Sequence, residues 1–428
     1  MLIDLADAES ATSGGKAAVL ARLLGARLPV PPGFVVPTAA YEKAVAGLDL
    51  ADAGTARRLI ERLPLAPALV DSISGALDRL VGAPGEGYVA VRSSASGEDT
   101  AEATAAGQHD TVLGVRGSGP VAEAVRRCWA SLWSERAVAY RSRRAAAVST
   151  GAPTVAVLVQ RLVDADVAGV MFTGTDIRIE ASWGLGASVV GGLVTPDSWT
   201  VSGDTLAHRS LGGKDRRIDR VGSRVVTREV PSADRQRCCL TDEEVVRLAK
   251  LGRDTADLLG GAQDIEWAIA DGRIWLLQAR PVTAAPPSAA PPSAAPPSAA
   301  RPTAAPWTAA PSSAPSGRTA EGTALTGTPG SPGVAVGPAR VVHGPGDFGR
   351  VRPGDVLVCR TTDPAWTPLF GVVAAVVTET GGLLSHAAIV AREQGLPAVL
   401  AVPGAMTALP DGAAVEVDGS GGRVGLTG

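Results

Sequence analysis

Lysine is scarce in this chain of 428 residues. Of its 40 basic residues only four are lysines, namely Lys16, Lys43, Lys214 and Lys250. A lysine inside a glycine-rich turn therefore stands out. Charge of either sign is also modest, with 19% charged residues and a net charge of −3. Nothing in this composition indicates the basic surface that binds nucleic acid.

Three further features are absent. The four cysteines form no CxxC pair and no disulfide-like spacing, which favours a reducing compartment. The first nine residues lack the basic and apolar regions of an export signal. The longest apolar run, near Val372, is too short to span a membrane. We therefore expect a soluble, cytoplasmic protein that has no membrane partner.

The chain is too long for a single core, and one proline-rich stretch divides it. Residues 284–298 repeat Ala-Ala-Pro-Pro-Ser three times, and degenerate copies continue to about Gly317. Proline at this density excludes helices and central strands, so 284–320 is predicted to be a disordered, extended linker. The linker is either an inert spacer or a tether between two working positions, and Trp307 is its one candidate for surface docking.

The most informative motif surrounds His386. Residues 372–377 form a short β-branched run typical of a buried strand, and the residues after His386 have helical periodicity. Between them, Gly381 and Gly382 allow a tight turn, and Ser385 is suited to capping the helix. A histidine at a helix start lies near exposed N–H groups that would stabilise a phosphate on its ring. The alternative is a histidine that only packs or caps.

From about Gly327 to Gly425 the chain resembles the phosphohistidine domain of the phosphoenolpyruvate synthase, pyruvate phosphate dikinase and rifampicin phosphotransferase superfamily. The resemblance includes the segment 331–337 as well as the motif around His386. It implies that residues 321–428 form a small β/α swivelling domain in which His386 carries a phosphoryl group.

Residues 1–283 carry a second set of motifs. Lys16 follows a glycine pair at the start of a predicted helix, without the spacing of a Walker A loop. With the proline-stiffened segment 28–36, it resembles the opening of the superfamily's ATP-binding domain, of ATP-grasp type. Arg92 ends a strand before a run of small hydroxyl residues, which suits phosphate recognition. The resemblance adds Thr104 and Gln108 in the next loop as nucleotide contacts.

That loop departs from the superfamily pattern at two positions. His109 stands where a second glutamine is common, and Ala105 where an aromatic residue is usual. Farther on, the resemblance makes Gln160, at the end of a predicted buried strand, and Glu180 candidates for adenine or ribose contacts. The alternative is that both are ordinary polar residues at strand ends.

Residues 263–281 predict a β-hairpin, with alternating apolar residues on both sides of an Asp271–Gly272 turn. This pairing places Glu266 near Gln278, and Arg280 on the face of Gln278. Oxygen ligands bind Mg²⁺ and arginine neutralises phosphate, so a site for Mg²⁺ and polyphosphate is expected here. A structural hairpin with a surface ion pair is the alternative.

The resemblance implies that ATP is cleaved to AMP, with His386 taking the β-phosphoryl group and water or phosphate taking the γ-phosphoryl group. Lys16, Arg92 and Arg280 would stabilise the phosphate charge, and Mg²⁺ on Glu266 and Gln278 would bridge the phosphates. Ser385, and less directly Arg392, would contact the phosphorylated ring.

The acceptor cannot be identified from the residues. Superfamily members carry either a pyruvate-binding barrel after the histidine domain or a drug-binding segment before it, and neither is recognisable here. One hypothesis is a compact phosphotransferase with a small-molecule acceptor, such as a secondary metabolite or antibiotic. A donor subunit for a separate acceptor protein and a non-catalytic remnant are the alternatives. An ATP-grasp ligase would share the first domain but release ADP.

Overall fold

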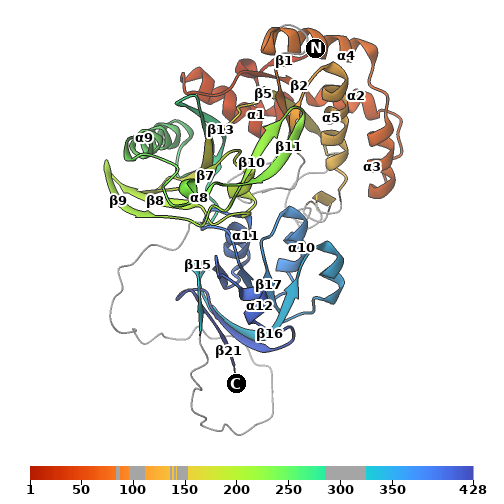
Figure 1. Cartoon of the computed structure of the whole chain (residues 1–428). Helices are drawn as coiled ribbons and strands as arrows, with labels where there is room; N and C mark the ends of the chain where they lie inside the picture. The colour runs from red at the N-terminus through yellow and green to blue at the C-terminus, as the bar shows by residue number, and fades with distance from the viewer. Residues whose placement is uncertain are drawn as a thin grey trace.

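The computed structural model describes residues 1–82, 87–95, 111–134, 137–138, 141, 153–284 and 324–427. The predicted contacts Thr104 and Gln108 lie outside the described residues, as do Ala105 and His109. The predicted linker also lies outside them, except for Ala284. The described chain folds into an amino-terminal unit and a smaller carboxyl-terminal unit below it (Figure 1). Both mix helices and strands, as the sequence predicts.

The amino-terminal unit starts with an antiparallel sheet in the order β1-β2-β5-β3-β4. Its strands are β1 (Ile3–Asp4), β2 (Gly33–Val36), β3 (Val89–Ala95), β4 (Thr111–Val115) and β5 (Val155–Arg161). The helical segments are η1 (Leu5–Asp7), α1 (Ser10–Gly25), α2 (Thr38–Val45), α3 (Ala53–Arg62), α4 (Pro67–Val81) and α5 (Ser118–Ser131). Val157 packs with α2–α5 and Leu158 packs with α1, so β5 is buried on both faces. This explains its unbroken apolar sequence.

A second antiparallel sheet of the same unit has the order β13-β12-β6-β7-β8-β9. Its strands are β6 (Val167–Phe172), β7 (Asp176–Trp183), β8 (Asp197–Ser202), β9 (Thr205–Ser210), β12 (Gln263–Ala270) and β13 (Arg273–Pro281). The remaining elements are α7 (Ala187–Val190), the ribbon β10 (Arg216–Val221) and β11 (Arg224–Glu229), α8 (Ser232–Arg235) and α9 (Asp242–Leu259). α1 and α9 share one apolar core with this sheet.

The predicted hairpin of residues 263–281 is confirmed as β12 and β13. Asp271 and Gly272 both have positive φ, which is the geometry of a tight hairpin turn. Glu266 lies directly opposite Gln278, as predicted. The register shifts after Glu266, so Leu277 has no partner across the ladder. This bulge leaves the Leu277 carbonyl available to a side chain.

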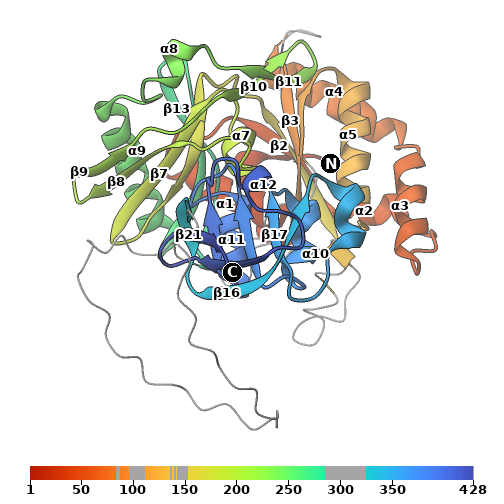
Figure 2. The same ribbon diagram turned by 60° about the horizontal axis from the view of Figure 1, so that its bottom comes forward.

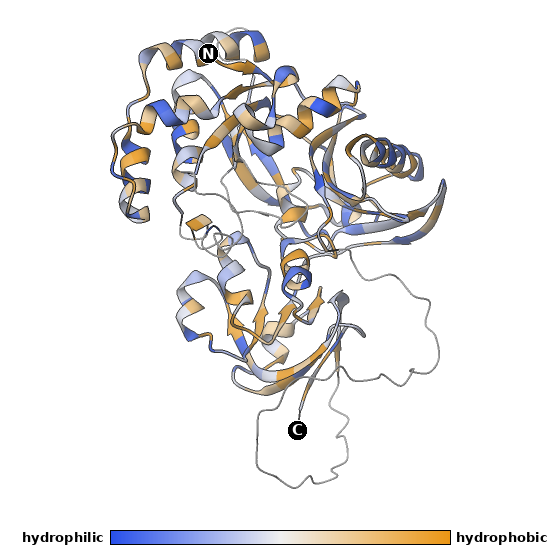
Figure 3. Ribbon diagram, turned by 180° about the vertical axis from the view of Figure 1, so that it is seen from behind, coloured by the Kyte–Doolittle hydropathy of each residue, from blue (hydrophilic) through white to orange (hydrophobic). Residues whose placement is uncertain are grey.

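The carboxyl-terminal unit contains a mixed sheet in the order β14-β21-β20-β16-β17-β18-β19-β15, with β16 to β19 parallel. The strands are β14 (Leu325–Thr326), β15 (Thr328–Ser331), β16 (Val334–Val342), β17 (Val356–Cys359), β18 (Ala375–Thr378), β19 (Ala398–Leu400), β20 (Ala414–Asp418) and β21 (Arg423–Leu426). The helical segments are η2 (Pro345–Arg350), η3 (Pro364–Trp366), α10 (Thr367–Phe370), α11 (His386–Gln394) and α12 (Ala405–Ala408). Apolar clusters cover both faces of the parallel strands, and hydrophobic residues gather there in Figure 3.

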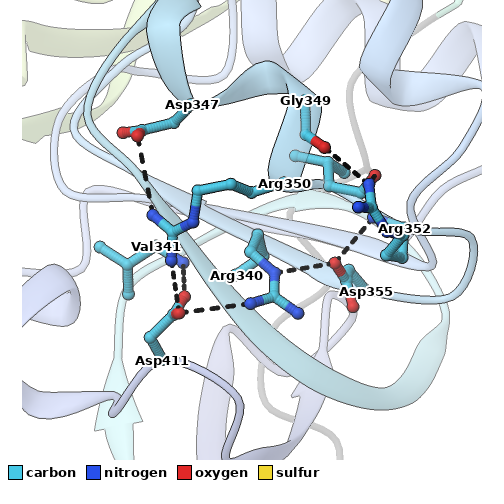
Figure 4. Close-up of polar contacts among 9 residues, drawn as sticks. Arg340, Val341, Asp347, Gly349, Arg350, Arg352, Asp355 and Asp411 are labelled. Atoms are coloured by element: carbon cyan, nitrogen blue, oxygen red, sulfur yellow. Dashed lines mark hydrogen bonds and ion pairs between the residues drawn. The ribbon is translucent and has the colours of Figure 1, made fainter.

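A polar network fixes the outer edge of this unit (Figure 4). Asp411 accepts hydrogen bonds from the Val341 N–H at 2.9 Å and from Arg350 at 2.6 Å. Arg340 contacts both Asp411 and the buried Asp355, at 3.2 and 3.0 Å. These contacts tie η2 and the loop before β20 to strand β16.

The carboxyl-terminal unit sits against the second sheet and α7, and Figure 2 shows it in front of the amino-terminal sheets. Leu384 and Ile389 join Val170, Phe172 and Val189 in a small apolar cluster shared by the two units. Among the described residues, no helix is both long and apolar enough to cross a membrane.

One ion pair is completely enclosed within the amino-terminal unit. Lys214 Nζ lies 2.5 Å from Asp197 Oδ1, and both side chains have 0% exposure. Asp197 also accepts hydrogen bonds from the Gly212 and Cys239 N–H groups, both at 2.8 Å. The pair thereby joins β8 to the segment before α9.

We predict that Lys214→Met lowers the free energy of unfolding by about 3–5 kcal/mol, because it leaves a buried carboxylate without its counter-ion. Lys250→Met is the matched control, since Lys250 pairs with Asp254 on the exposed surface of α9. It should change stability by less than about 0.5 kcal/mol. Chemical denaturation followed by tryptophan fluorescence measures both. Equal effects of the two substitutions would contradict the role given to the buried pair.

Candidate active site

A cavity of about 360 Å³ lies where the two units meet. Residues from both units line it, and they include most of the side chains selected from the sequence: Lys16, Arg92, Gln160, Glu266, Gln278, Arg280 and His386. The cavity therefore brings together groups that are up to 370 positions apart in the sequence, from Lys16 to His386. Three candidates within the described residues do not line this cavity, namely Glu180, Ser385 and Arg392.

Lys16 reaches the cavity because α1 is interrupted at Gly14. This glycine has φ 75° and ψ 170° within the helix. A Cβ there would lie 2.1 Å from the Ser94 carbonyl oxygen, so only glycine lets α1 approach strand β3 so closely. The Ala17 N–H donates to Ser94 Oγ at 3.2 Å, and Lys16 Nζ lies 3.4 Å from the Ser93 carbonyl oxygen. The glycine pair thus positions the lysine by a tertiary contact as well as by a turn.

Arg92 is the centre of a polar cluster on the β12–β13 hairpin. Its guanidinium donates to the Leu277 carbonyl at 2.7 Å, which is the carbonyl released by the bulge. It also contacts Gln278 Oε1 and, at 3.4 Å, Glu266 Oε2. The Arg92 side chain is 12% exposed and that of Glu266 is 29% exposed. The hairpin therefore presents two side-chain oxygens to the cavity and holds Arg92 of β3 beside them.

Arg280 is held by Asp264, a residue that the sequence analysis did not select. The two lie opposite each other on β13 and β12, and Arg280 Nε and Nη2 approach Asp264 Oδ2 at 2.8 and 2.6 Å. Both side chains are nearly buried. Asp264 shares a strand face with Glu266, two positions along β12, and this alternation was the signal that could have identified it.

Gln160, near the end of β5, is 3% exposed and donates from Nε2 to the Pro31 carbonyl at 2.8 Å. It lies beside the apolar part of the cavity wall, which includes Val163, Ala165 and Leu185. A polar group next to an apolar wall suits a planar base. The predicted nucleotide contact of Gln160 stays a prediction.

His386 is the first residue of α11 and is 5% exposed. Thr362 Oγ1 lies 2.9 Å from its Nδ1, and Thr367 Oγ1 lies 3.3 Å from its Nε2. The ring meets Phe370 edge to face, with 6.0 Å between ring centroids. Neither threonine was selected from the sequence, because η3 and α10 approach His386 only through tertiary packing.

Burial, together with the nearby positive charge of Arg280, lowers the pKa of His386 from 6.5 to about 4. The ring is therefore neutral at physiological pH, with a nitrogen lone pair available for attack. The predicted N-cap position of Ser385 is correct, but its side chain makes no cap hydrogen bond. Its hydroxyl donates to the Gly382 carbonyl at 2.8 Å instead, which closes the turn before the histidine.

Glu180 has partners other than the nucleotide contact expected from the sequence. Its carboxylate accepts hydrogen bonds from the Leu383 and Leu384 N–H groups, at 2.7 and 3.0 Å. Burial raises the pKa of Glu180 from 4.5 to about 7, against the opposing effects of these two donors and of Arg392 and Arg178. Glu180 thus binds the turn that precedes His386, and its contact with a nucleotide stays a prediction.

Arg392 was expected, less directly than Ser385, to contact the phosphorylated ring. It lies on α11, and its hydrogen bonds direct it away from the ring. Its Nε donates to the Ala284 carbonyl at 3.2 Å and its Nη1 to the Gly330 carbonyl at 3.0 Å. Burial lowers the pKa of Arg392 to about 10, with Glu180 among the acidic groups that oppose this shift. The side chain anchors the carboxyl-terminal unit in this arrangement.

Comparison with known proteins agrees with this two-part site. Residues 10–297 match the family described as pyruvate phosphate dikinase, AMP/ATP-binding domain. Residues 351–422 match the family described as PEP-utilising enzyme, mobile domain. The chain belongs to the pyruvate phosphate dikinase and phosphoenolpyruvate synthase family.

Curated relatives in this family are named as phosphoenolpyruvate synthases. A probable phosphoenolpyruvate synthase of Methanothermobacter thermautotrophicus is 34% identical over 96% of this chain and 61% of its own length. That of Archaeoglobus fulgidus is also 34% identical, over 96% and 56%. The phosphoenolpyruvate synthase of Pyrococcus furiosus is 32% identical, over 96% and 56%. The chain thus spans about 56–61% of the length of these relatives.

Among solved structures, that of an Enzyme I protein is 31% identical over 18% of this chain and 31% of its own length, with a TM-score of 0.17. No cluster of three or more histidine, cysteine, aspartate or glutamate residues suited to a metal ion occurs within the described ranges.

The low pKa of His386 gives a direct test of its burial. Because the docked pKa lies below the ordinary value, protonation opposes docking. The contribution of the neutral His386 ring to docking is complete above about pH 6.5 and is lost as the pH falls toward about 4. In NMR spectra of ¹⁵N-histidine-labelled protein, we expect the His386 ring not to titrate between about pH 8 and about pH 5. The exposed His208 and His343 serve as references, and a His386 midpoint near 6.5 would contradict a docked, buried ring.

Proposed function

We propose that this chain carries out the ATP-cleaving half-reaction of a dikinase-type phosphotransferase and passes the phosphoryl group from His386 to an acceptor. The observation that supports this most strongly is the shared cavity, in which a buried neutral histidine lies beside cationic and oxygen-bearing side chains. An ATP-grasp ligase has no use for a histidine in that position.

In the proposed reaction, Nδ1–H of His386 donates to Thr362 Oγ1, which leaves the lone pair on Nε2 for attack. Nε2 forms a bond to the β-phosphorus of ATP, and the bond from that phosphorus to the α,β-bridging oxygen breaks. AMP leaves with the electron pair of that bond. Water or inorganic phosphate then takes the γ-phosphoryl group, so the β-phosphoryl group remains on the ring.

The cations around the cavity have a clear electrostatic role in this proposal. Lys16, Arg92 and Arg280 stabilise negative charge that develops on the phosphates and on the departing AMP. Asp264 holds the guanidinium of Arg280 in position for this. Mg²⁺ would neutralise the β- and γ-phosphates when bound. Glu266 and Gln278 fit it as oxygen ligands, once Arg92 turns from them to the phosphates.

We propose that the acceptor meets the histidine after it has left this cavity, because in the proposed reaction the nucleotide occupies the cavity while the ring is loaded. We propose a small-molecule acceptor with a hydroxyl, enol or carbonyl oxygen. Pyruvate is the first to test, since the relatives are named phosphoenolpyruvate synthases. After labelling, loss of phosphate from the protein on adding pyruvate supports it. Retention of the label favours another small molecule or a separate acceptor protein.

We predict that ATP with Mg²⁺ yields AMP and an acid-labile, base-stable phosphoryl label on the protein. His386→Ala should abolish the label and leave ATP binding unchanged, because the nucleotide-binding side chains belong to the other unit. His343→Ala, at an exposed histidine of the same unit, is the matched control and should label normally. Chromatography of the nucleotides, with β-³²P-ATP for the label, measures both. ADP as the sole nucleotide product would contradict the proposal.

The metal site has its own test. Glu266→Gln removes the charged oxygen ligand but keeps the shape of the side chain, so we expect the Mg²⁺ concentration for half-maximal labelling to rise at least about tenfold. Glu243→Gln, on the exposed side of α9, should leave it unchanged. An unchanged requirement in Glu266→Gln would show that this carboxylate does not hold the metal.

A further inference from the structure

The turn before His386 is bound by a single buried carboxylate of the other unit. Glu180 lies on β7, is 4% exposed, and uses both oxygens: Oε1 for the Leu383 N–H and Oε2 for the Leu384 N–H. These N–H groups are more than 200 positions away in the sequence and come just before the helix that His386 begins. A carboxylate on two backbone donors fixes both the distance and the direction of the turn.

The residue facing this carboxylate is a glycine for a steric reason. A Cβ on Gly382 would lie 2.3 Å from Glu180 Oε2 and 2.5 Å from its Cδ. Gly382 does not have the positive φ that Gly381 has, so its backbone conformation is open to alanine. The requirement for glycine at 382 therefore comes from Glu180, and exists only when the two units are in contact.

Two threonine hydrogen bonds also connect the two units near this carboxylate. Thr361 Oγ1 donates to the Gly191 carbonyl and Thr380 Oγ1 to the Gly192 carbonyl, both at 2.7 Å. Leu384 packs beside them into the apolar cluster shared with β6 and α7. These contacts hold the turn 381–385 against the amino-terminal unit. The position of this turn then determines where His386 enters the cavity.

We propose that Glu180 is a positioning residue, the carboxylate that receives the turn 381–385 and thereby seats His386 over the nucleotide cavity. Glu180 acts through this turn and does not line the cavity itself. What the seated histidine does there rests on the proposed function. The seating itself can be measured without any reaction.

The test uses a disulfide that reports contact between the units. Thr283 Oγ1 lies 2.8 Å from Glu393 Oε1 across the interface, so the rate at which Thr283→Cys and Glu393→Cys are joined by mild oxidation reports how closely and how often the units approach. Cys238→Ser removes the partly exposed natural cysteine from the background. Rate of disulfide formation, ATP affinity and phosphoryl labelling are then measured for each variant in this reporter protein, and labelling also without the cysteine pair.

We expect Gly382→Ala to slow both disulfide formation and labelling by about tenfold or more, with ATP affinity unchanged. Glu180→Gln keeps the volume but places an amide N–H₂ against one of the two donors. It should slow both by about tenfold. Gly349→Ala is the matched control, because a Cβ there meets nothing within 4 Å. It should behave like the parent protein.

The decisive variant combines Glu180→Ala with Gly382→Ala. Removing the carboxylate makes room for the added methyl group, so the pair should seat and label better than Gly382→Ala alone. A general folding defect would instead add up across the two substitutions. Labelling and disulfide formation at the parent rate in Gly382→Ala, or no recovery in the pair, would overturn the inference. Absence of label in the parent protein, with normal disulfide formation, would instead count against the proposed function.

Discussion

A buried ring beside a guanidinium has to be uncharged, and the candidate site depends on this constraint. His386 lies in a cavity that Lys16, Arg92 and Arg280 make attractive to anions. An imidazolium there would lose its hydration and meet like charge, which is why its pKa falls to about 4. Burial is the larger cause of the shift, and Arg280, one of the groups that would attract a polyphosphate, adds to it. The ring is therefore kept neutral only while the two units are in contact.

The elements that depend on interactions between neighbouring residues could be predicted from the sequence. The Asp271–Gly272 turn and the alternation around it predicted the hairpin and the pairing of Glu266 with Gln278, and β12 and β13 have both. The strand before His386 and the helix after it were likewise expected, although the strand β18 begins at Ala375, later than predicted. In each case the deciding interactions lie within about 20 residues.

Tertiary contacts decided what the sequence analysis missed. The bulge after Glu266 supplies the Leu277 carbonyl to Arg92, and no residue type marks it. Thr362 and Thr367 reach His386 through the packing of η3 and α10. Asp264 was missed for a different reason. Alternation along the strand places it on the same face as Glu266, but its role becomes clear only from its ion pair with Arg280. The two glycines of the histidine turn also differ. Gly381 is required by its positive φ, and Gly382 because a Cβ there would collide with the carboxylate of the distant Glu180.

The contact between the units differs in kind from the cores within them. Each unit encloses large clusters of valine, leucine and alanine between sheets and helices. The interface has one small apolar cluster, threonine hydroxyls on glycine carbonyls, and a carboxylate on backbone N–H groups. When polar contacts of this kind break, their groups form hydrogen bonds with water instead. Separating the units therefore exposes little apolar surface, whereas opening a core would expose much. In the proposed function this contact forms for phosphoryl loading and breaks for delivery, and interactions of this kind suit both steps. Their geometry, more than their strength, then determines where the histidine is placed.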